Sequence, residues 1–131
     1  MKIIALKKGD RVVEKLTSLV DEAKIPSGLI IGLGALSCAE LMVYKLEDKE
    51  YSSKSLSGSL EVGSFSAVIA HDPEGETHLH PHIVISNQDF ETYAGHLKEG
   101  IVAATFEAVI LENNEAVKRY RDSDIGLNLI K

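Results

Sequence analysis

The first clear hydrophobic pattern of the chain predicts a helix close to its start. Asp10 is placed to cap this helix, and Pro26-Ser27-Gly28 ends it, because proline removes a backbone donor and glycine adds backbone freedom. A short apolar segment at residues 2–6 precedes the helix and is typical of a strand. The apolar positions that recur at helical spacing are Val12, Val13, Leu16, Leu19, Val20 and Ala23.

From residue 29 onward the pattern is that of consecutive strands. Gly32 and Gly34 indicate that another backbone approaches the first of them closely. Asp72-Pro73-Glu74-Gly75 is the clearest turn, and it predicts an antiparallel hairpin. One early helix followed by strands predicts an α+β fold, in which an N-terminal amphipathic helix packs on a mostly antiparallel β-sheet. The expected strands cover residues 29–36, 39–46, 51–62, 64–71, 77–86 and 101–112.

Length and the last segment complete the expected architecture. The chain has 131 residues, 44% of them apolar, and shows no repeat or linker, so residues 1–131 are expected to form one domain with its own core. The basic run Lys118-Arg119-Tyr120-Arg121 is flanked by acidic residues and is interpreted as the solvated face of one or two helical turns at residues 115–121. Residues 125–130 are expected to form a last strand or a packed tail.

The charge of the chain argues against nucleic acid as a direct partner. Fourteen Lys and Arg against 20 Asp and Glu give a formal net charge of -6, which repels a phosphate backbone. No apolar run is long enough to cross a membrane, and the first residues lack the longer apolar region of a secretory leader. We therefore expect a cytoplasmic protein with no membrane contact and no direct DNA contact.

Three histidines alternate along the expected strand at residues 77–86. In an extended strand His78, His80 and His82 share one face, which separates them from an apolar face. Alternate residues lie roughly 6.5 to 7 Å apart, a spacing at which two imidazoles can converge on one ion. His96 is the natural third ligand, because the chain between the two segments is long enough to turn back. The apolar side chains on the opposite face are Leu79, Pro81, Ile83 and Ile85.

Three neutral histidines with an open fourth position describe a metal site. Zn²⁺ is the first choice, and Ni²⁺, Co²⁺ and Fe²⁺ also accept this ligand type. The same histidines could instead form a solvated polar face, a subunit contact or a pH-sensitive patch without metal. Glu107 is the one carboxylate nominated as an acid, a base or a group that orients a ligand histidine, with an ordinary edge glutamate as the alternative.

Six segments carry a further signal in their order and spacing. They are residues 26–36, 39–41, 55–60, 80–86, 94–100 and 104–110. Together they resemble the plants and prokaryotes conserved (PPC) domain, also called the AT-hook-associated domain, in its stand-alone prokaryotic form. The resemblance takes in almost the whole chain.

The resemblance implies an α+β fold, a homotrimer and, as in several prokaryotic members, a metal ion bound by the matching histidines. It assigns His80, His82 and His96 as the metal ligands, whereas His78 is an extra histidine that is either a fourth ligand or a neighbour. In plant relatives an AT-hook with an Arg-Gly-Arg core enters the minor groove of DNA. This chain has no such core.

The expected function is therefore that of a metal-binding homotrimer whose physiological role the sequence does not indicate. If the protein is an enzyme, metal-assisted chemistry on a small molecule is the expected class. The alternatives are a DNA-binding, transcription-associated regulator, which rests on family association, and a protein-interaction scaffold without metal chemistry.

Overall fold

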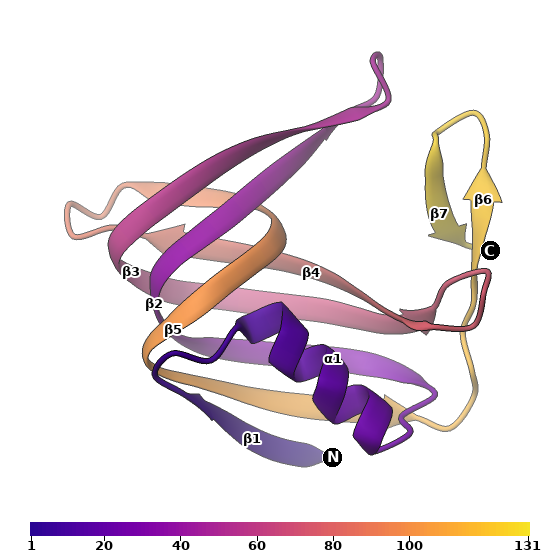
Figure 1. Ribbon diagram of the computed structural model, residues 1–131, viewed down its shortest axis with the longest axis horizontal. Coiled ribbons are helices and arrows are strands. Elements are labelled where there is room, and N and C mark those ends of the chain that lie inside the picture. The colour runs from indigo at the N-terminus through magenta and orange to yellow at the C-terminus, as the bar shows by residue number, and fades with distance from the viewer.

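The computed structural model describes residues 1–131 as seven strands and one helix (Figure 1). The structure is mostly antiparallel sheet with one short helix packed on it, and this helix follows a first strand rather than opening the chain. No helix has the length and apolar character that crossing a membrane requires. The elements are β1 (Lys2–Lys7), α1 (Val12–Glu22), β2 (Ser27–Lys45), β3 (Glu50–His71), β4 (Thr77–Ser86), β5 (Thr92–Asn113), β6 (Arg119–Asp122) and β7 (Leu127–Ile130).

Strands β1 to β5 form one antiparallel sheet, in which β5, β2, β3 and β4 close into a ring of pairings. The strand order is β1-β5-β2-β3-β4, and β4 pairs in addition with the first part of β5. Because β5 is long, it pairs with β4 near its start and with β1 and β2 further on. The expected turn after His71 joins β3 to β4 as an antiparallel hairpin, which confirms that prediction. The ends of β2 and β3 continue past the other strands as a two-stranded arm (Figure 1).

Strands that the sequence predicts as separate are continuous in the structure. Residues 29–36 and 39–45 both belong to β2, and the break between them is an irregularity of register between Leu36 and Cys38. A similar irregularity lies between Gly32 and Gly34. A β-bulge bends a strand without ending it, so local turn signals need not separate two elements.

The core lies between α1 and the concave face of the sheet. The helix contributes Val12, Leu16 and Val20, all fully buried, as its amphipathic pattern predicts. On the sheet, the rings of Phe65 and Phe106 meet edge to face with centroids 5.1 Å apart. Alternate strand residues therefore point away from this core, and the histidines of β4 are among them.

The start of α1 is held by a residue distant in sequence. Asp10 was the expected cap, but its carboxylate accepts a hydrogen bond from the backbone N–H of Lys7 at 3.0 Å and none from the helix. The carboxylate of Glu99 in β5 accepts from the backbone N–H of Val13 at 2.8 Å and of Glu14 at 3.1 Å. A negative charge here satisfies free donors and favours the helix dipole.

Replacing Glu99 with alanine is expected to lower the free energy of unfolding by about 1 kcal/mol, because a helix loses its cap. Urea denaturation followed by circular dichroism measures the change. Asp21→Ala is the matched control, since it removes one negative charge from the exposed surface of the same helix where no side-chain hydrogen bond is lost. Equal destabilisation by the two variants would contradict the capping role.

The chain ends in a β-hairpin, so the predicted helical turns at residues 115–121 are wrong. β6 pairs antiparallel with β7. The side chain of Asp122 accepts hydrogen bonds from the backbone N–H groups of Asp124 and Ile125, and Gly126 has a φ of 84°. An aspartate-initiated turn and a left-handed glycine favour a hairpin over a helix at this point. The last strand expected within residues 125–130 is confirmed as β7.

Candidate metal centre

The alternation expected for the histidine strand is present in β4. Leu79, Pro81, Ile83 and Ile85 are buried, whereas His80 and His82 are exposed on the opposite face. Pro81 lies opposite Ala67 of β3, and the pairing of β4 with β5 begins only at the next residue. A strand that is half open on one side tolerates a residue without an N–H group.

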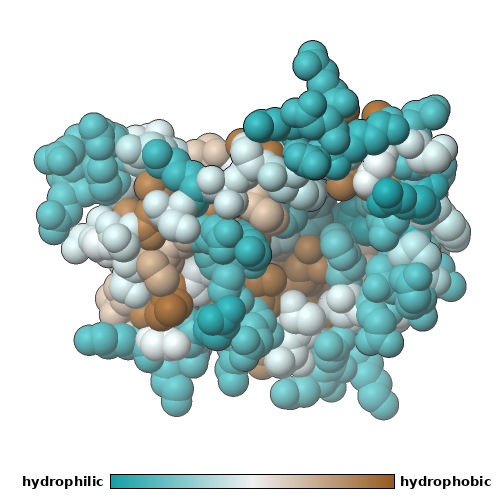
Figure 2. Space-filling model, turned by 45° about the horizontal axis from the view of Figure 1, so that its top comes forward, coloured by the Kyte–Doolittle hydropathy of each residue, from teal (hydrophilic) through white to brown (hydrophobic).

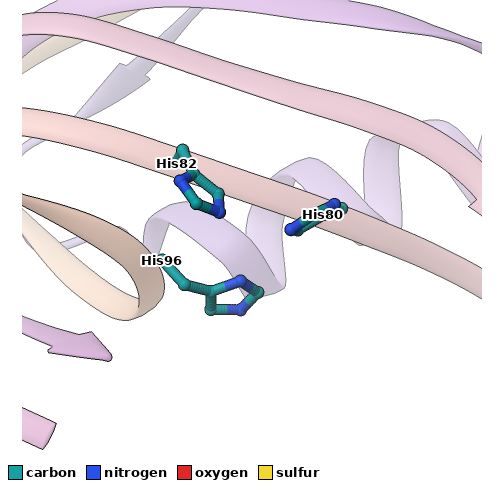
Figure 3. Close-up of side chains that lie close together, drawn as sticks. All are labelled: His80, His82 and His96. Carbon is teal, nitrogen blue, oxygen red and sulfur yellow. The ribbon is translucent and has the colours of Figure 1, made fainter. Parts of the chain in front are cut away.

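Three histidines converge because two strands meet at this point. His96 of β5 is the direct cross-strand partner of His82. The ring centroids are 5.0 Å apart for His80 and His82, 5.5 Å for His80 and His96, and 5.7 Å for His82 and His96. One ring nitrogen from each residue lies within 4.8 Å of the others. Figure 3 shows the three rings turned toward one shared space.

This arrangement fits a zinc ion by donor type and by size. Four-coordinate Zn²⁺ binds histidine nitrogen at about 2.0 to 2.1 Å, which places ligand nitrogens of a tetrahedron about 3.4 Å apart. The nitrogens of His80, His82 and His96 all lie within 4.8 Å of one another, so they are close to this separation before an ion binds. Three protein ligands leave one position of the tetrahedron free.

Two of the three imidazoles, those of His80 and His96, are held in the neutral form that binds metal. Partial burial of its ring lowers the pKa of His80 to about 4, helped by the positive charge of Arg119 and then by the neighbouring histidines. Burial also lowers the pKa of His96, followed by the effect of His82 and of His78. Neutral imidazole has a lone pair for a metal, so at neutral pH no proton has to leave these two residues before an ion binds.

His78 lies beside the cluster rather than in it. It pairs with Ala70 of β3, in the part of β4 that β5 does not reach, and it is not among the three residues whose nitrogens converge. Its pKa is lowered by burial and then by Arg119. It lines the same cavity as His80 and His96, so it is a neighbour of the cluster in this geometry.

Glu107 and His71 lie elsewhere. In the sheet register Glu107 is placed between Ala5 of β1 and Leu33 of β2. Two cavities border the histidine cluster, and Glu107 lines neither of them. His71 ends β3 opposite Thr77 and lines a different cavity next to the helix. The carboxylate of Glu107 therefore does not lie at the histidine cluster.

A cavity of about 340 Å³ opens beside the histidines, and residues near the end of the chain form part of it. Arg119 of β6 is 5% exposed, so it does not belong to the solvated face predicted for residues 118–121, whereas the other three residues of this run are exposed. Figure 2 shows the surface hollowed below the projecting arm, with apolar side chains in its floor. The lining residues are Met42, Tyr51, His78, His80, His96, Arg119, Arg121, Leu127, Asn128 and Leu129.

Sequence reasoning missed Arg119 and Tyr51 as parts of this site. The ring of Tyr51 in β3 lies 5.9 Å from that of His96, and a tyrosine on a long strand carries no local sign of this contact. A signal for Arg119 was present, because two short strand-like runs flank a turn with Asp122 and Gly126. A hairpin predicted from these two runs would have placed Arg119 in a strand and not in a helix.

The comparisons with known proteins agree with one another on the fold. A family model described as the Plants and Prokaryotes Conserved (PCC) domain matches residues 2–114. No curated protein matches the chain.

Solved structures resemble nearly the whole chain. A candidate DNA-binding protein from Bacteroides thetaiotaomicron matches with a TM-score of 0.94 and 28% identity over 98% of this chain and 90% of that one. A metal-containing protein from Archaeoglobus fulgidus matches with a TM-score of 0.90 and 29% identity over 99% and 91%. A plant- and prokaryote-conserved (PPC) protein from Pyrococcus horikoshii matches with a TM-score of 0.90 and 24% identity over 99% and 90%.

Proposed function

We propose that this chain, which belongs to the Plants and Prokaryotes Conserved (PCC) domain family, binds a divalent metal ion, first of all Zn²⁺, through His80, His82 and His96. The observation that carries the proposal is the convergence of three ring nitrogens within 4.8 Å. The name of the related Archaeoglobus fulgidus protein, which describes it as metal-containing, supports it.

The bound ion would supply a Lewis acid and an acidified water at its free position. The protein's own part is to hold three imidazoles on two paired strands, so that little backbone entropy is lost when the ion binds. Backbone pairing of His82 with His96 fixes two of the three ligands relative to each other.

Titration with Co²⁺ tests the proposal directly, because this ion absorbs visible light strongly when it is four-coordinate and weakly when it is six-coordinate. We expect saturation at one ion per chain with a four-coordinate spectrum, and displacement of Co²⁺ by added Zn²⁺. If added Co²⁺ gave no saturable absorption with the wild-type protein, the proposed metal site would be contradicted.

We also propose that three copies of this chain assemble, each with residues 1–131 as one domain. The number three comes from the resemblance to the PPC domain, and the support for association is a strip of apolar side chains on the sheet face that points away from the core. Ile3 of β1 and Ile31 of β2 flank Val109 in the register, and all of these face outward. Exposed apolar strips of this kind mark association surfaces. The strip consists of Ile3, Ile31, Leu33 and Leu111, which are 40% to 76% exposed.

Light scattering of the wild-type protein at low micromolar concentration should give three times the mass of one chain. Leu33→Asp should lower this mass toward that of a single chain, because a charge in a packed apolar interface loses its hydration. Leu46→Asp, at an exposed apolar position in the turn that ends the arm, is the matched control and should leave the mass unchanged. A wild-type monomer would contradict the assembly.

A DNA-binding role is the second candidate, because the related Bacteroides thetaiotaomicron protein bears that name. The net charge of -6 opposes it. We expect no electrophoretic shift of an A·T-rich duplex at moderate salt. A shift that weakens steeply as salt is raised would establish the second candidate instead.

A further inference from the structure

An arginine is buried without an anionic partner at the edge of the histidine cavity. The side chain of Arg119 is 5% exposed, yet it forms no ion pair with any carboxylate of the chain. Its Nη1 lies 3.4 Å from the carbonyl oxygen of Asn128, which is a long hydrogen bond, and its Nε has no hydrogen-bond partner.

Such a buried, unpaired guanidinium is unfavourable unless a group from outside the chain supplies a counter-charge and hydrogen-bond acceptors. A buried charge without a counter-ion costs several kcal/mol, and buried donors are nearly always bonded. Burial lowers the pKa of Arg119 from its usual value, because it disfavours the charged form of the guanidinium. An anion beside the guanidinium would supply the missing charge.

The guanidinium and the histidine cluster open to the same space. Arg119, His80 and His96 all line the cavity of about 340 Å³. The charge of Arg119 is also close enough to His80 to contribute to its lowered pKa. One molecule can therefore contact the arginine and face His80 and His96 of the cluster at the same time.

The rest of the lining indicates what kind of anion fits. The apolar side chains of Met42, Leu127 and Leu129 and the ring of Tyr51 form much of the wall, which suits a carbon skeleton better than an inorganic ion. The planar fork of a guanidinium matches the two oxygens of a planar carboxylate. A volume of this size, at the lower end for ligand cavities, favours a small molecule.

We propose that this cavity binds a small organic carboxylate, whose carboxylate group is held by Arg119 while another of its oxygens faces the metal ion at His80, His82 and His96. The assignment rests on the proposed metal site and names the ligand class of that site. Tyr51 and the leucines of β7 contact the carbon skeleton.

The hairpin that carries Arg119 is tied to the body of the protein, so the arginine is in place before a ligand arrives. The backbone N–H of His71 donates to the carbonyl oxygen of Val117 at 2.8 Å. The hydroxyl of Tyr44 donates to the carbonyl of Ile125 at 2.6 Å. The family match ends at residue 114, before this hairpin begins, so the carboxylate site depends on a segment outside the matched region.

Calorimetric titration of the Zn²⁺-loaded protein with lactate, 3-hydroxybutyrate and succinate tests the inference, with methyl lactate and inorganic phosphate as comparison ligands. At least one of the three acids should bind at one per chain, and methyl lactate should not. Arg119→Met keeps the packing of the side chain and should weaken that acid at least about 10-fold. Arg121→Met, the exposed arginine of the same cavity, is the matched control and should have a smaller effect.

Melting temperature gives a readout that does not depend on binding alone. Without ligand, Arg119→Met should melt at the same temperature as the wild type or higher, because an unpaired buried charge is removed. The acid should raise the melting temperature of the wild type and not that of Arg119→Met. A much lower melting temperature of ligand-free Arg119→Met would mean that the arginine is structural, which overturns the inference.

The outcomes separate this inference from the proposed metal site. If the protein binds Zn²⁺ but none of the acids, or binds only phosphate, the carboxylate inference is overturned and the metal site stands. If the protein binds no metal but an acid binds in an Arg119-dependent manner, the arginine's role stands and the metal proposal fails.

Discussion

Replacing His80 with alanine is expected to lower the affinity of the protein for Zn²⁺ by at least about 100-fold. Loss of a residue that merely orients a ligand costs 10- to 100-fold in metal affinity, so loss of a ligand reaches at least the upper end of that range. The same result is expected for His82→Ala and His96→Ala, because each supplies one of the three converging nitrogens. Competition with a chelating zinc indicator measures the affinity.

Two other histidines provide controls of graded distance. His71→Ala should leave zinc affinity unchanged, because His71 lines a different cavity. His78→Ala should change it only slightly, since His78 shares the cavity but not the cluster. A loss of zinc affinity in His78→Ala as large as that in His80→Ala would mean that the extra histidine is a ligand. All these side chains lie outside the apolar core, so the fold should persist.

Replacing Gly34 with alanine is expected to destabilise the protein by about 3 kcal/mol or more. Gly34 has a φ of 153°, where other residues are strained. A Cβ built there would lie 2.8 Å from the Cα of Phe106 and closer still to the carbonyl oxygen of Thr105. β5 would have to move away from β2, and the core position of Phe106 would move with it. Urea denaturation measures the loss.

Gly63→Ala is the matched control for this strand glycine. Gly63 lies at the irregularity of β3, and a Cβ built there meets only the carbonyl oxygen of Val84 at 3.9 Å. The control should change the free energy of unfolding by less than about 1 kcal/mol. If Gly34→Ala were as stable as Gly63→Ala, β2 and β5 would not approach as closely as the structure has them.

Local periodicity predicted the faces of β4 but could not choose among its histidines. Alternation alone places three of them on one side, and the structure bears this out. The choice of His80 and His82 with His96 depends on the register in which β4 meets β5, which no local pattern encodes. The three ligands were instead predicted from the resemblance to the PPC domain, a family to which the chain does belong.

Long-range contacts account for what the sequence argument missed. Asp10 had the right type and position for a helix cap, but Glu99 reaches the same backbone donors from β5. The burial of Arg119 follows from a hairpin that docks on the arm through Tyr44, a contact between residues 81 positions apart in the chain. By contrast, the close approach at Gly34 was predictable, because a glycine inside a strand has few other reasons to be there.

Metal analysis of untagged protein, purified without any exposure to nickel resin, tests the central claim most directly. The metal content of the wild type and of a variant with alanine at His80, His82 and His96 should be compared by mass spectrometry of the dissolved metal. We predict close to one divalent ion per chain, mainly zinc, in the wild type and almost none in the variant. Wild-type protein with only traces of metal, or equal metal content in the two proteins, would contradict the account.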